Sequence, residues 1–126
     1  MSRPEVSIVI PVYNEEAMLP TLYQRLIELI NRNGTYAWEI LFINDGSSDR
    51  TLDVIRQLRQ TDSRVNFVNL SRNFGKEAAM TAGLHQAKGD AMVPMDVDLQ
   101  DPPALILEFV KLWQTGDYDT RSEERR

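Results

Sequence analysis

Two aspartates separated by one residue, Asp96 and Asp98, directly follow a short apolar run, 91–93. Carboxylates at this spacing can hold a hard divalent cation, Mg²⁺ or Mn²⁺, and substrate phosphates fill its other coordination positions. Gln100 could add an amide oxygen to the metal or bind the phosphate. The same D-x-D spacing also occurs in turns, so the inference depends on its position after a buried strand. We expect a Mg²⁺ or Mn²⁺ site at Asp96, Asp98 and Gln100.

Asp101 is expected to have a different role from the two aspartates before it. It precedes Pro102 and Pro103. Proline favours the first helical turn, and aspartate favours the capping position before that turn. We therefore assign Asp101 to the start of the next helix rather than to the metal.

Three other polar segments, 11–16, 44–49 and 71–77, also follow apolar runs. In the first, Tyr13 offers a flat surface for a base and Glu15 an acceptor. In the second, Asp45 could accept hydrogen bonds from a base N–H or a ribose hydroxyl, as acidic residues do at strand ends in dinucleotide folds.

The same segments have a purely structural interpretation. Asn14 could cap the first helix, with Glu15 and Glu16 favouring its dipole. Asp45 and Gly46 form a turn signal, and Ser48 or Asp49 could cap the second helix. Both interpretations can hold together.

In the third segment, Lys76 and the backbone N–H groups after Gly75 lie at a predicted helix start, which is a natural anion site. The Walker spacing G-x-x-x-x-G-K-[ST] is absent, and so is G-x-G-x-x-G. A nicotinamide dehydrogenase is therefore poorly supported. The single histidine, His85, falls nine residues beyond Lys76 and is expected to be structural or exposed rather than catalytic.

The elements that must position these side chains alternate along the chain. Buried strands are predicted at 6–12, 38–45, 65–70 and 91–96, because these runs are short and rich in Val and Ile. Helical spacing is found at 19–30 (ending near Asn33 and Gly34), 52–58, 76–88 and after Pro103. This β-α alternation predicts an α/β fold with a parallel four-stranded sheet, flanking helices and right-handed crossovers. Ligands of such sheets bind beyond the carboxyl ends of the strands.

Bulk composition excludes several classes of protein. The chain has 126 residues, enough for one domain, and its net charge of -5 argues against a nucleic-acid binder. It has no cysteine, which removes disulfides and thiolate catalysis. No segment is long and apolar enough to span a membrane or act as a signal peptide, so a cytoplasmic, soluble chain is expected.

Four ordered segments give the sequence a family resemblance. PVYNEE, NDGSSD, SRNFGKEAAMTAG and DVDLQDPP resemble the family 2 glycosyltransferases of the GT-A fold. The last two look like the branch that acts on polyprenyl phosphates, such as undecaprenyl- and dolichyl-phosphate. The resemblance implies a Rossmann-like nucleotide-sugar-binding domain over residues 1–118, incomplete at its C-terminal side, and a charged tail over 119–126. The chain would then be a fragment, a truncated product or a sequence with a deletion near Thr120.

The resemblance also implies an activity: metal-dependent, inverting transfer of a sugar from a UDP-glucose-like or GDP-mannose-like donor to a polyprenyl phosphate. The protein would act in cell-envelope glycan synthesis as a peripheral protein at the inner face of the cell membrane. An acceptor phosphate is already an anion, so no strong base is required. Carried over by position, the nucleotide-sugar site comprises Pro11, Tyr13, Glu15, Ile43 through its backbone, Asp45, Lys76, Asp96, Val97 and Asp98, with Asp96 and Asp98 catalytic.

Other functions remain open at this point. One is a soluble glycosyltransferase with a saccharide acceptor, and another is a nucleotidyltransferase on a similar sheet. A third is a nucleotide-binding module that is catalytically incomplete. An exposed sheet edge would favour self-association, so a homo-oligomer is a further expectation.

Overall fold

The computed structural model describes residues 4–97 of the chain; residues 1–3 and 98–126 lie outside the described part. Strands and helices alternate, as predicted. The elements are β1 (Glu5–Val12), α1 (Leu19–Arg32), β2 (Ala37–Asn44), α2 (Thr51–Thr61), β3 (Val65–Asn69), α3 (Lys76–Gln86) and β4 (Ala91–Pro94). The helix predicted after Pro103 and the tail predicted at 119–126 lie outside the described residues.

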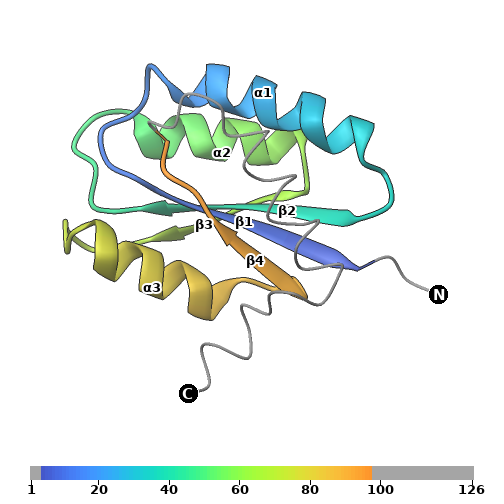
Figure 1. The fold of residues 1–126 in the computed structure, drawn as a ribbon. Helices are drawn as coiled ribbons and strands as arrows, with labels where there is room; N and C mark the ends of the chain where they lie inside the picture. Colours follow the sequence, from blue (N-terminus) through green and yellow to red (C-terminus); the bar gives the residue numbers. More distant parts are fainter. Residues whose placement is uncertain (1–3, 98–126) are drawn as a thin grey trace.

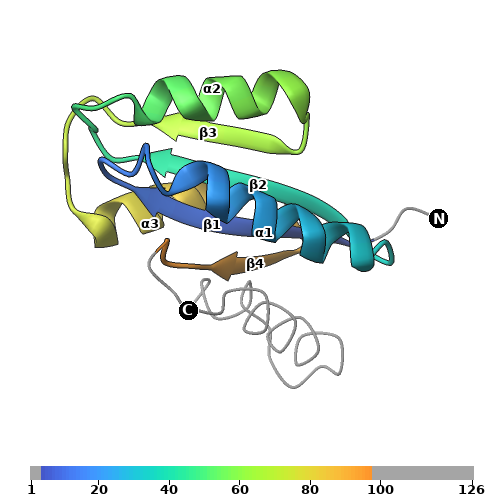
Figure 2. The same cartoon turned by 90° about the horizontal axis from the view of Figure 1, so that it is seen from above.

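The four strands form one parallel sheet in the order β3-β2-β1-β4 (Figures 1 and 2). The chain builds outward from β1 to β2 and β3, and then crosses back to place β4 on the other side of β1. In open parallel sheets, ligands bind beyond the carboxyl ends of the strands where the strand order changes direction in this way. The topology therefore points to the end of β1, between β2 and β4.

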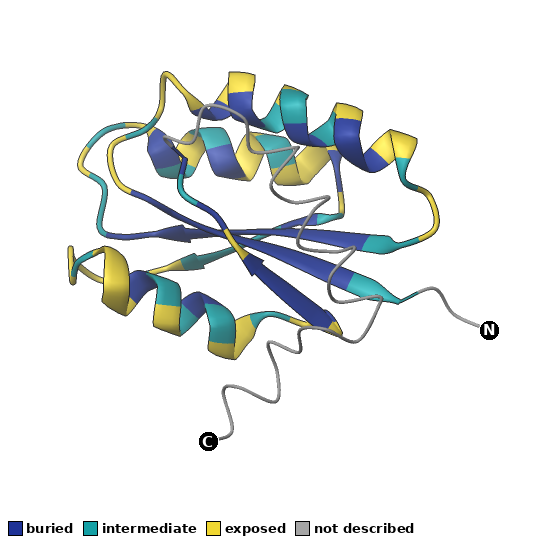
Figure 3. Cartoon of the chain, viewed as in Figure 1, coloured by how far each residue is buried: buried dark blue, intermediate teal, exposed yellow. Residues whose placement is uncertain are grey.

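Helices cover both faces of the sheet: α1 and α2 lie on one face and α3 on the other (Figure 1). Successive side chains of a strand point to opposite faces. In β1, Ile8 and Ile10 accordingly belong to the core under α1 and α2, whereas Val9 packs with Ala79 of α3. Burial on both faces explains why the strands have nearly continuous apolar runs (Figure 3).

The helical periodicity of α1 is confirmed. Its buried face lies within the predicted segment 19–30, and the helix ends at Arg32 with Asn33 as the C-terminal cap. The buried residues of this helix are Leu19, Leu22, Leu26, Leu29 and Ile30. None of the helices within residues 4–97 combines the length and apolar character that a membrane crossing needs.

The small residues of α3 allow it to approach the sheet closely. Gly83 is buried against β1 and β2. A Cβ atom added there would lie 2.4 Å from Cδ1 of Ile43 and 2.5 Å from Cγ1 of Val9. Both distances are well below van der Waals contact, so the position has no room for a side chain.

Substitution of Gly83 tests this contact. Gly83→Val should lower the free energy of unfolding by about 1–3 kcal/mol, because the added side chain must displace Ile43 and Val9 from a filled core. Urea denaturation measures the change. Gly34→Ala is the control, because a Cβ at Gly34 meets nothing within 4 Å. An equally stable Gly83→Val variant would contradict the close packing.

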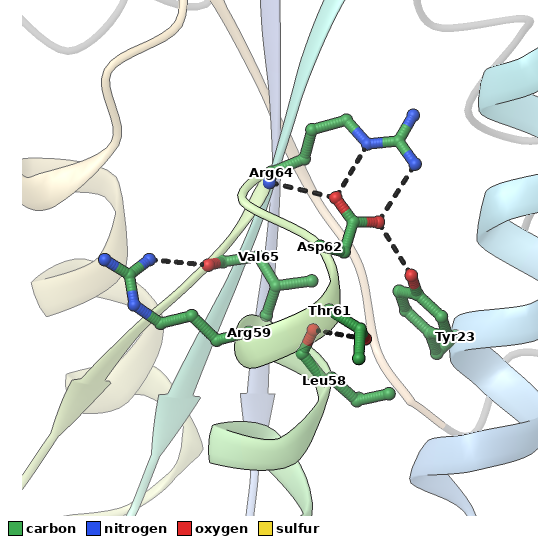
Figure 4. A network of polar contacts seen from close by, with 7 residues as sticks. All are labelled: Tyr23, Leu58, Arg59, Thr61, Asp62, Arg64 and Val65. Atoms are coloured by element: carbon green, nitrogen blue, oxygen red, sulfur yellow. Dashed lines mark hydrogen bonds and ion pairs between the residues drawn. The ribbon is translucent and has the colours of Figure 1, made fainter.

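A polar network joins α1 to the connection between α2 and β3 (Figure 4). Asp62 is buried and accepts hydrogen bonds from the Tyr23 hydroxyl at 2.7 Å and from Nε and Nη2 of Arg64 at 2.9 Å each. The hydrogen bonds from Arg64 are the main cause that lowers the pKa of Asp62 from its ordinary value of 3.8 to about 2. Burial, followed by the bond to Asp62, raises the pKa of Tyr23 to about 12.

This network should make stability depend on acidity. Because the pKa of Asp62 is lower in the folded state, its contribution is complete above pH 3.8 and is lost as the pH falls towards about 2. The contribution corresponds to roughly 2 kcal/mol. Asp62→Asn should remove this part of the acid dependence in denaturation curves. Asp53→Asn, which alters an exposed 3.6 Å pair with Arg50, should leave the acid dependence unchanged.

Candidate functional site

The polar segments that follow the four strands do converge. They surround a pocket of about 370 Å³ at the carboxyl edge of the sheet. This edge of the sheet lies on the left in Figure 1. Every strand contributes to its wall, either directly or through the loop that follows it. The lining residues are Pro11, Val12, Tyr13, Glu15, Asp45, Asn73, Gly75, Lys76, Asp96 and Val97.

Asn14 joins the loop after β1 to the loop after β2. Its Oδ1 accepts the backbone N–H of Ser48 at 2.8 Å and of Asp49 at 3.2 Å, and its own N–H donates to Ser47 Oγ at 2.9 Å. The residue has a positive φ of 53°, a conformation that asparagine tolerates better than most residues. The suggestion that Asn14 caps α1 is therefore wrong. That helix begins after Met18, with no side-chain cap, and Asn14 braces the neighbouring loop instead.

The acidic residues of the second loop divide between two structural roles. Asp49 Oδ1 accepts hydrogen bonds from Thr51 N–H at 2.9 Å and from its hydroxyl at 2.5 Å, at the first residue of α2. Desolvation is the largest single effect on the pKa of Asp49 and raises it, but the hydrogen bonds from Thr51, Glu16 and its own N–H together outweigh it, so the pKa is lowered. Asp49 thus accepts the first N–H of α2, but the predicted cap, Ser48 or Asp49, is wrong, because the cap position is Arg50 and it makes no side-chain cap bond. Asp49 Oδ2 also accepts the N–H of Glu16 at 3.3 Å.

Asp45 is almost completely buried and holds the loop that follows β3. Its Oδ1 accepts the N–H of Phe74 at 2.8 Å. Its Oδ2 accepts the N–H of Gly75 at 3.1 Å and the side-chain amide of Asn73 at 3.2 Å. A carboxylate oxygen has about two acceptor positions. Oδ2 is therefore saturated, whereas Oδ1 retains capacity for one further donor from the pocket.

Gly46 makes the approach of these two loops sterically feasible. It has a φ of +69°, and a Cβ there would lie 2.3 Å from both the carbonyl carbon of Arg72 and the amide nitrogen of Asn73. Backbone atoms cannot move aside as side-chain ends can. The D-G pair that the sequence marked as a turn therefore also packs directly against the next loop.

The first turn of α3 faces the pocket. Its cap position is Gly75, which has no side chain with which to cap the first N–H groups of the helix. Such groups, together with the positive end of the helix dipole, favour anions. Lys76, the first residue of the helix, lines the same pocket. The helix start that the sequence predicts as an anion site therefore borders the pocket, and anion binding there stays a prediction.

Lys76 and Asp96 form an ion pair across the pocket. Lys76 Nζ lies 2.5 Å from Asp96 Oδ2. The side chains are 61% and 35% exposed, so solvent and ligands can reach both. The pair connects the end of β4 to the start of α3 and brings the predicted metal-ligating carboxylate beside the predicted phosphate-binding cation.

The described part of the pocket supplies one oxygen donor that suits a hard cation. Asp96 gives a carboxylate on the pocket wall, and oxygen donors are what Mg²⁺ and Mn²⁺ prefer. Within residues 4–97, no group of three or more His, Asp, Glu or Cys side chains is close enough to hold a metal ion. The other predicted ligands, Asp98 and Gln100, lie outside the described residues, as does Asp101.

The remaining predicted residues fall in two classes. Pro11, Glu15 and Val97 line the pocket, and Tyr13 does so with 48% of its surface exposed. Ile43 is fully buried beneath α3 and is not among the lining residues, so any part it plays is through its backbone. His85 is exposed in the last turn of α3, as expected, and does not line the pocket.

Two asparagines that the sequence did not indicate as site residues line the pocket or hold its loops together. Asn73 lines the pocket and also donates its side-chain amide to the Asp45 carbonyl oxygen at 3.1 Å. For Asn14, the sequence predicted only the role of a helix cap. Both lie in polar loops immediately after strands, which was the available signal. Their partners are more than 25 residues away in sequence, and local spacing does not reveal such contacts.

Replacing Asp45 tests its hold on the neighbouring loop. In Asp45→Asn, one carboxylate oxygen becomes an amide group that cannot accept, so Phe74 or Gly75 loses its partner. We expect unfolding to become easier by about 1–3 kcal/mol, with faster hydrogen exchange at both amides. Asp90→Asn is the control, since Asp90 bonds the Glu5 N–H at the other end of the sheet. Unchanged exchange at Phe74 and Gly75 would refute this role.

The sequence of this chain is similar to those of known proteins. The family model described as glycosyl transferase family 2 matches residues 7–120. An uncharacterized glycosyltransferase of Bacillus subtilis, YkcC, is 48% identical over 117 residues, which cover 92% of this chain and 36% of the relative. The bactoprenol glucosyl transferase of Shigella phage SfV is 46% identical over 112 residues, which cover 89% and 36%. The chain thus spans about a third of the length of these relatives.

Solved structures agree on the fold. The mannosyltransferase PcManGT from Pyrobaculum calidifontis, in complex with GDP-Man and Mn²⁺, matches with a TM-score of 0.66 at 23% identity, over 80% of this chain and 30% of its own. S. aureus TarS 1-349, in complex with UDP, matches with a TM-score of 0.65 at 25% identity, over 82% and 32%. The sheet and its flanking helices are those of the GT-A fold.

Proposed function

The chain belongs to glycosyl transferase family 2, and from that premise we propose that it forms the nucleotide-sugar-binding part of a metal-dependent transferase. The observation that carries the proposal is the pocket at the carboxyl edge of the sheet. There an aromatic surface, an uncapped helix start, a lysine and an aspartate face one space of about 370 Å³. These groups match, in kind, the base, diphosphate and metal of a nucleotide-sugar.

The diphosphate would bind at the start of α3. The N–H groups of the first turn and the ammonium of Lys76 are the cationic and donor groups on the pocket wall. The base would lie against Tyr13, whose ring is half exposed. The remaining acceptor position of Asp45 Oδ1 is available to a base N–H or a ribose hydroxyl. Pro11, Glu15 and Val97 complete the wall, and Ile43 would contribute through its backbone.

Asp96, Asp98 and Gln100 would hold Mg²⁺ or Mn²⁺. A divalent cation there supplies Lewis-acid stabilisation of the diphosphate leaving group. The residues of the chain have the task of orienting that leaving group, and the first turn of α3 would fix it from the other side. Asp96 and Asp98 are thus the residues we regard as catalytic.

A polyprenyl phosphate is the acceptor that we propose, with inversion at the sugar carbon. The support is the name of several relatives, bactoprenol glucosyl transferase, together with the DVDLQDPP and SRNFGKEAAM segments. An anionic phosphate can attack without a strong base. This fits a pocket whose described wall carries no histidine, with His85 exposed on α3. The donor would be UDP-glucose-like or GDP-mannose-like.

The setting of the protein follows from that acceptor. A transferase that uses a polyprenyl phosphate for cell-envelope glycans must reach the membrane surface, so we propose a peripheral position at its inner face. We also keep residues 1–118 as the nucleotide-sugar-binding domain and 119–126 as a charged tail. A homo-oligomer remains part of the proposal because β3 and β4 are the outer strands of the described sheet.

Metal-dependent nucleotide binding is the test of the proposal. Calorimetry with UDP and with GDP, each with and without Mn²⁺, should detect binding of one nucleotide that requires the metal. Asp96→Ala and Asp98→Ala should each weaken it at least about tenfold, which corresponds to about 1.4 kcal/mol, because each removes a carboxylate ligand of the metal. Asp101→Asn is the matched control and should bind almost normally, because Asp101 is assigned to a helix cap.

Two results would overturn these assignments. A folded sample that binds neither UDP nor GDP in the presence of Mn²⁺ would refute the nucleotide-sugar pocket. Loss of binding in Asp101→Asn with normal binding in Asp98→Ala would reverse the roles of these two aspartates. Transfer assays with a polyprenyl phosphate and with an oligosaccharide would then decide the acceptor, because only the former should gain the sugar.

A further inference from the structure

The position of Lys76 is unusual for a cation. It is the first residue of α3, where the helix dipole has its positive end and where acidic residues are favoured. It is paired with Asp96, whose carboxylate lies 2.5 Å away in the segment that follows β4. The lysine is therefore tolerated there because of a carboxylate that the proposed function assigns to a metal.

We propose that Lys76 is the resident counter-ion of Asp96 and that a divalent cation must displace it. The inference rests on the proposed function and assigns Lys76 a second role, beyond contact with the donor. Asp96 Oδ2 is engaged by the ammonium at 2.5 Å. A metal bound to that oxygen would have the ammonium within a few ångströms, and two cations so close repel each other strongly. Metal binding and the ion pair therefore exclude each other.

Displaced from Asp96, Lys76 has an alternative partner in the same pocket. A diphosphate at the first turn of α3 would lie next to Lys76, because Lys76 is the first residue of that helix and lines the pocket. The side chain is 61% exposed, so it can turn without breaking packing. The nucleotide thereby removes the competitor of the metal, and the metal releases the lysine for the nucleotide. Each ligand should increase the affinity of the other, beyond any direct bond between them.

Such coupling must be reciprocal. In a variant without Lys76, the coupling predicts opposite changes in the affinities for metal and nucleotide. Without Lys76, the metal no longer competes with an ammonium, so it binds the nucleotide-free chain more tightly. The nucleotide loses a cation, so it binds the metal-saturated chain more weakly. A lysine that only touched the diphosphate would give the second effect without the first.

The experiment measures Mn²⁺ binding by electron paramagnetic resonance in the full chain without nucleotide, and UDP or GDP binding at saturating Mn²⁺. In Lys76→Met, Mn²⁺ affinity should rise about five- to tenfold and nucleotide affinity should fall by a similar factor, within the usual range of coupling between sites. Lys76→Arg keeps the positive charge, so it should bring both affinities back close to their wild-type values. Lys88→Met, at an exposed lysine outside this pocket, is the matched control and should change neither.

The possible failures are distinct. If wild-type chain binds Mn²⁺ but Lys76→Met binds it with equal or lower affinity, Lys76 is not the counter-ion and this inference is wrong, whereas the nucleotide pocket survives. If Lys76→Met gains Mn²⁺ affinity and Lys76→Arg does not reverse the gain, charge is not the cause. If folded wild-type chain binds neither Mn²⁺ nor nucleotide, the proposed function itself is refuted, and the counter-ion role falls with it.

Discussion

The hydrogen bonds accepted by the buried carboxylate of Asp45 are the interaction on which the pocket depends. They hold Asn73, Phe74 and Gly75, and hence the loop that leads into α3, against the end of β2. A buried carboxylate is costly unless its lone pairs are satisfied, so the loop and the carboxylate stabilise each other. The first turn of α3 and Lys76 acquire their place in the pocket as a consequence.

The remaining walls are fixed by the same principle. Asn14 ties the loop after β1 to the loop after β2, as Asp45 ties the loop after β2 to the loop after β3. Three consecutive loops are thus braced by side chains before any ligand arrives. Binding of the proposed nucleotide would then cost little ordering of the protein, which is the advantage of preorganisation. The fourth wall differs, because Asp96 forms an exposed ion pair with Lys76 that the proposed metal would replace.

The sequence predicts the architecture well because the positions of the strands and helices depend on local periodicity. Runs buried on both faces and helical spacing such as that of Leu22, Leu26 and Leu29 specify elements without knowledge of the fold. The parallel sheet then follows from connection rules, and its carboxyl edge indicates which loops meet. Lys76 and Asp96 were both identified, yet nothing in their spacing indicates that they pair.

The sequence does not indicate the hydrogen-bond partner of each buried polar side chain. Glu39 lies inside a run that reads as a buried strand, but it is 2% exposed and accepts bonds from Ser7, Asn66 and the Lys88 N–H. Asp45, near the other end of the same strand, is satisfied in the same way by a different loop. Partners 25 to 50 residues apart are brought together by tertiary structure, so propensity and motif spacing could not reveal them.

A crystal structure of the chain with UDP or GDP and Mn²⁺ tests the central claim most directly. The account predicts the diphosphate beside the first turn of α3, the metal on Asp96, and Lys76 turned from Asp96 to the phosphate. A nucleotide bound outside the pocket at the carboxyl edge of the sheet would contradict it.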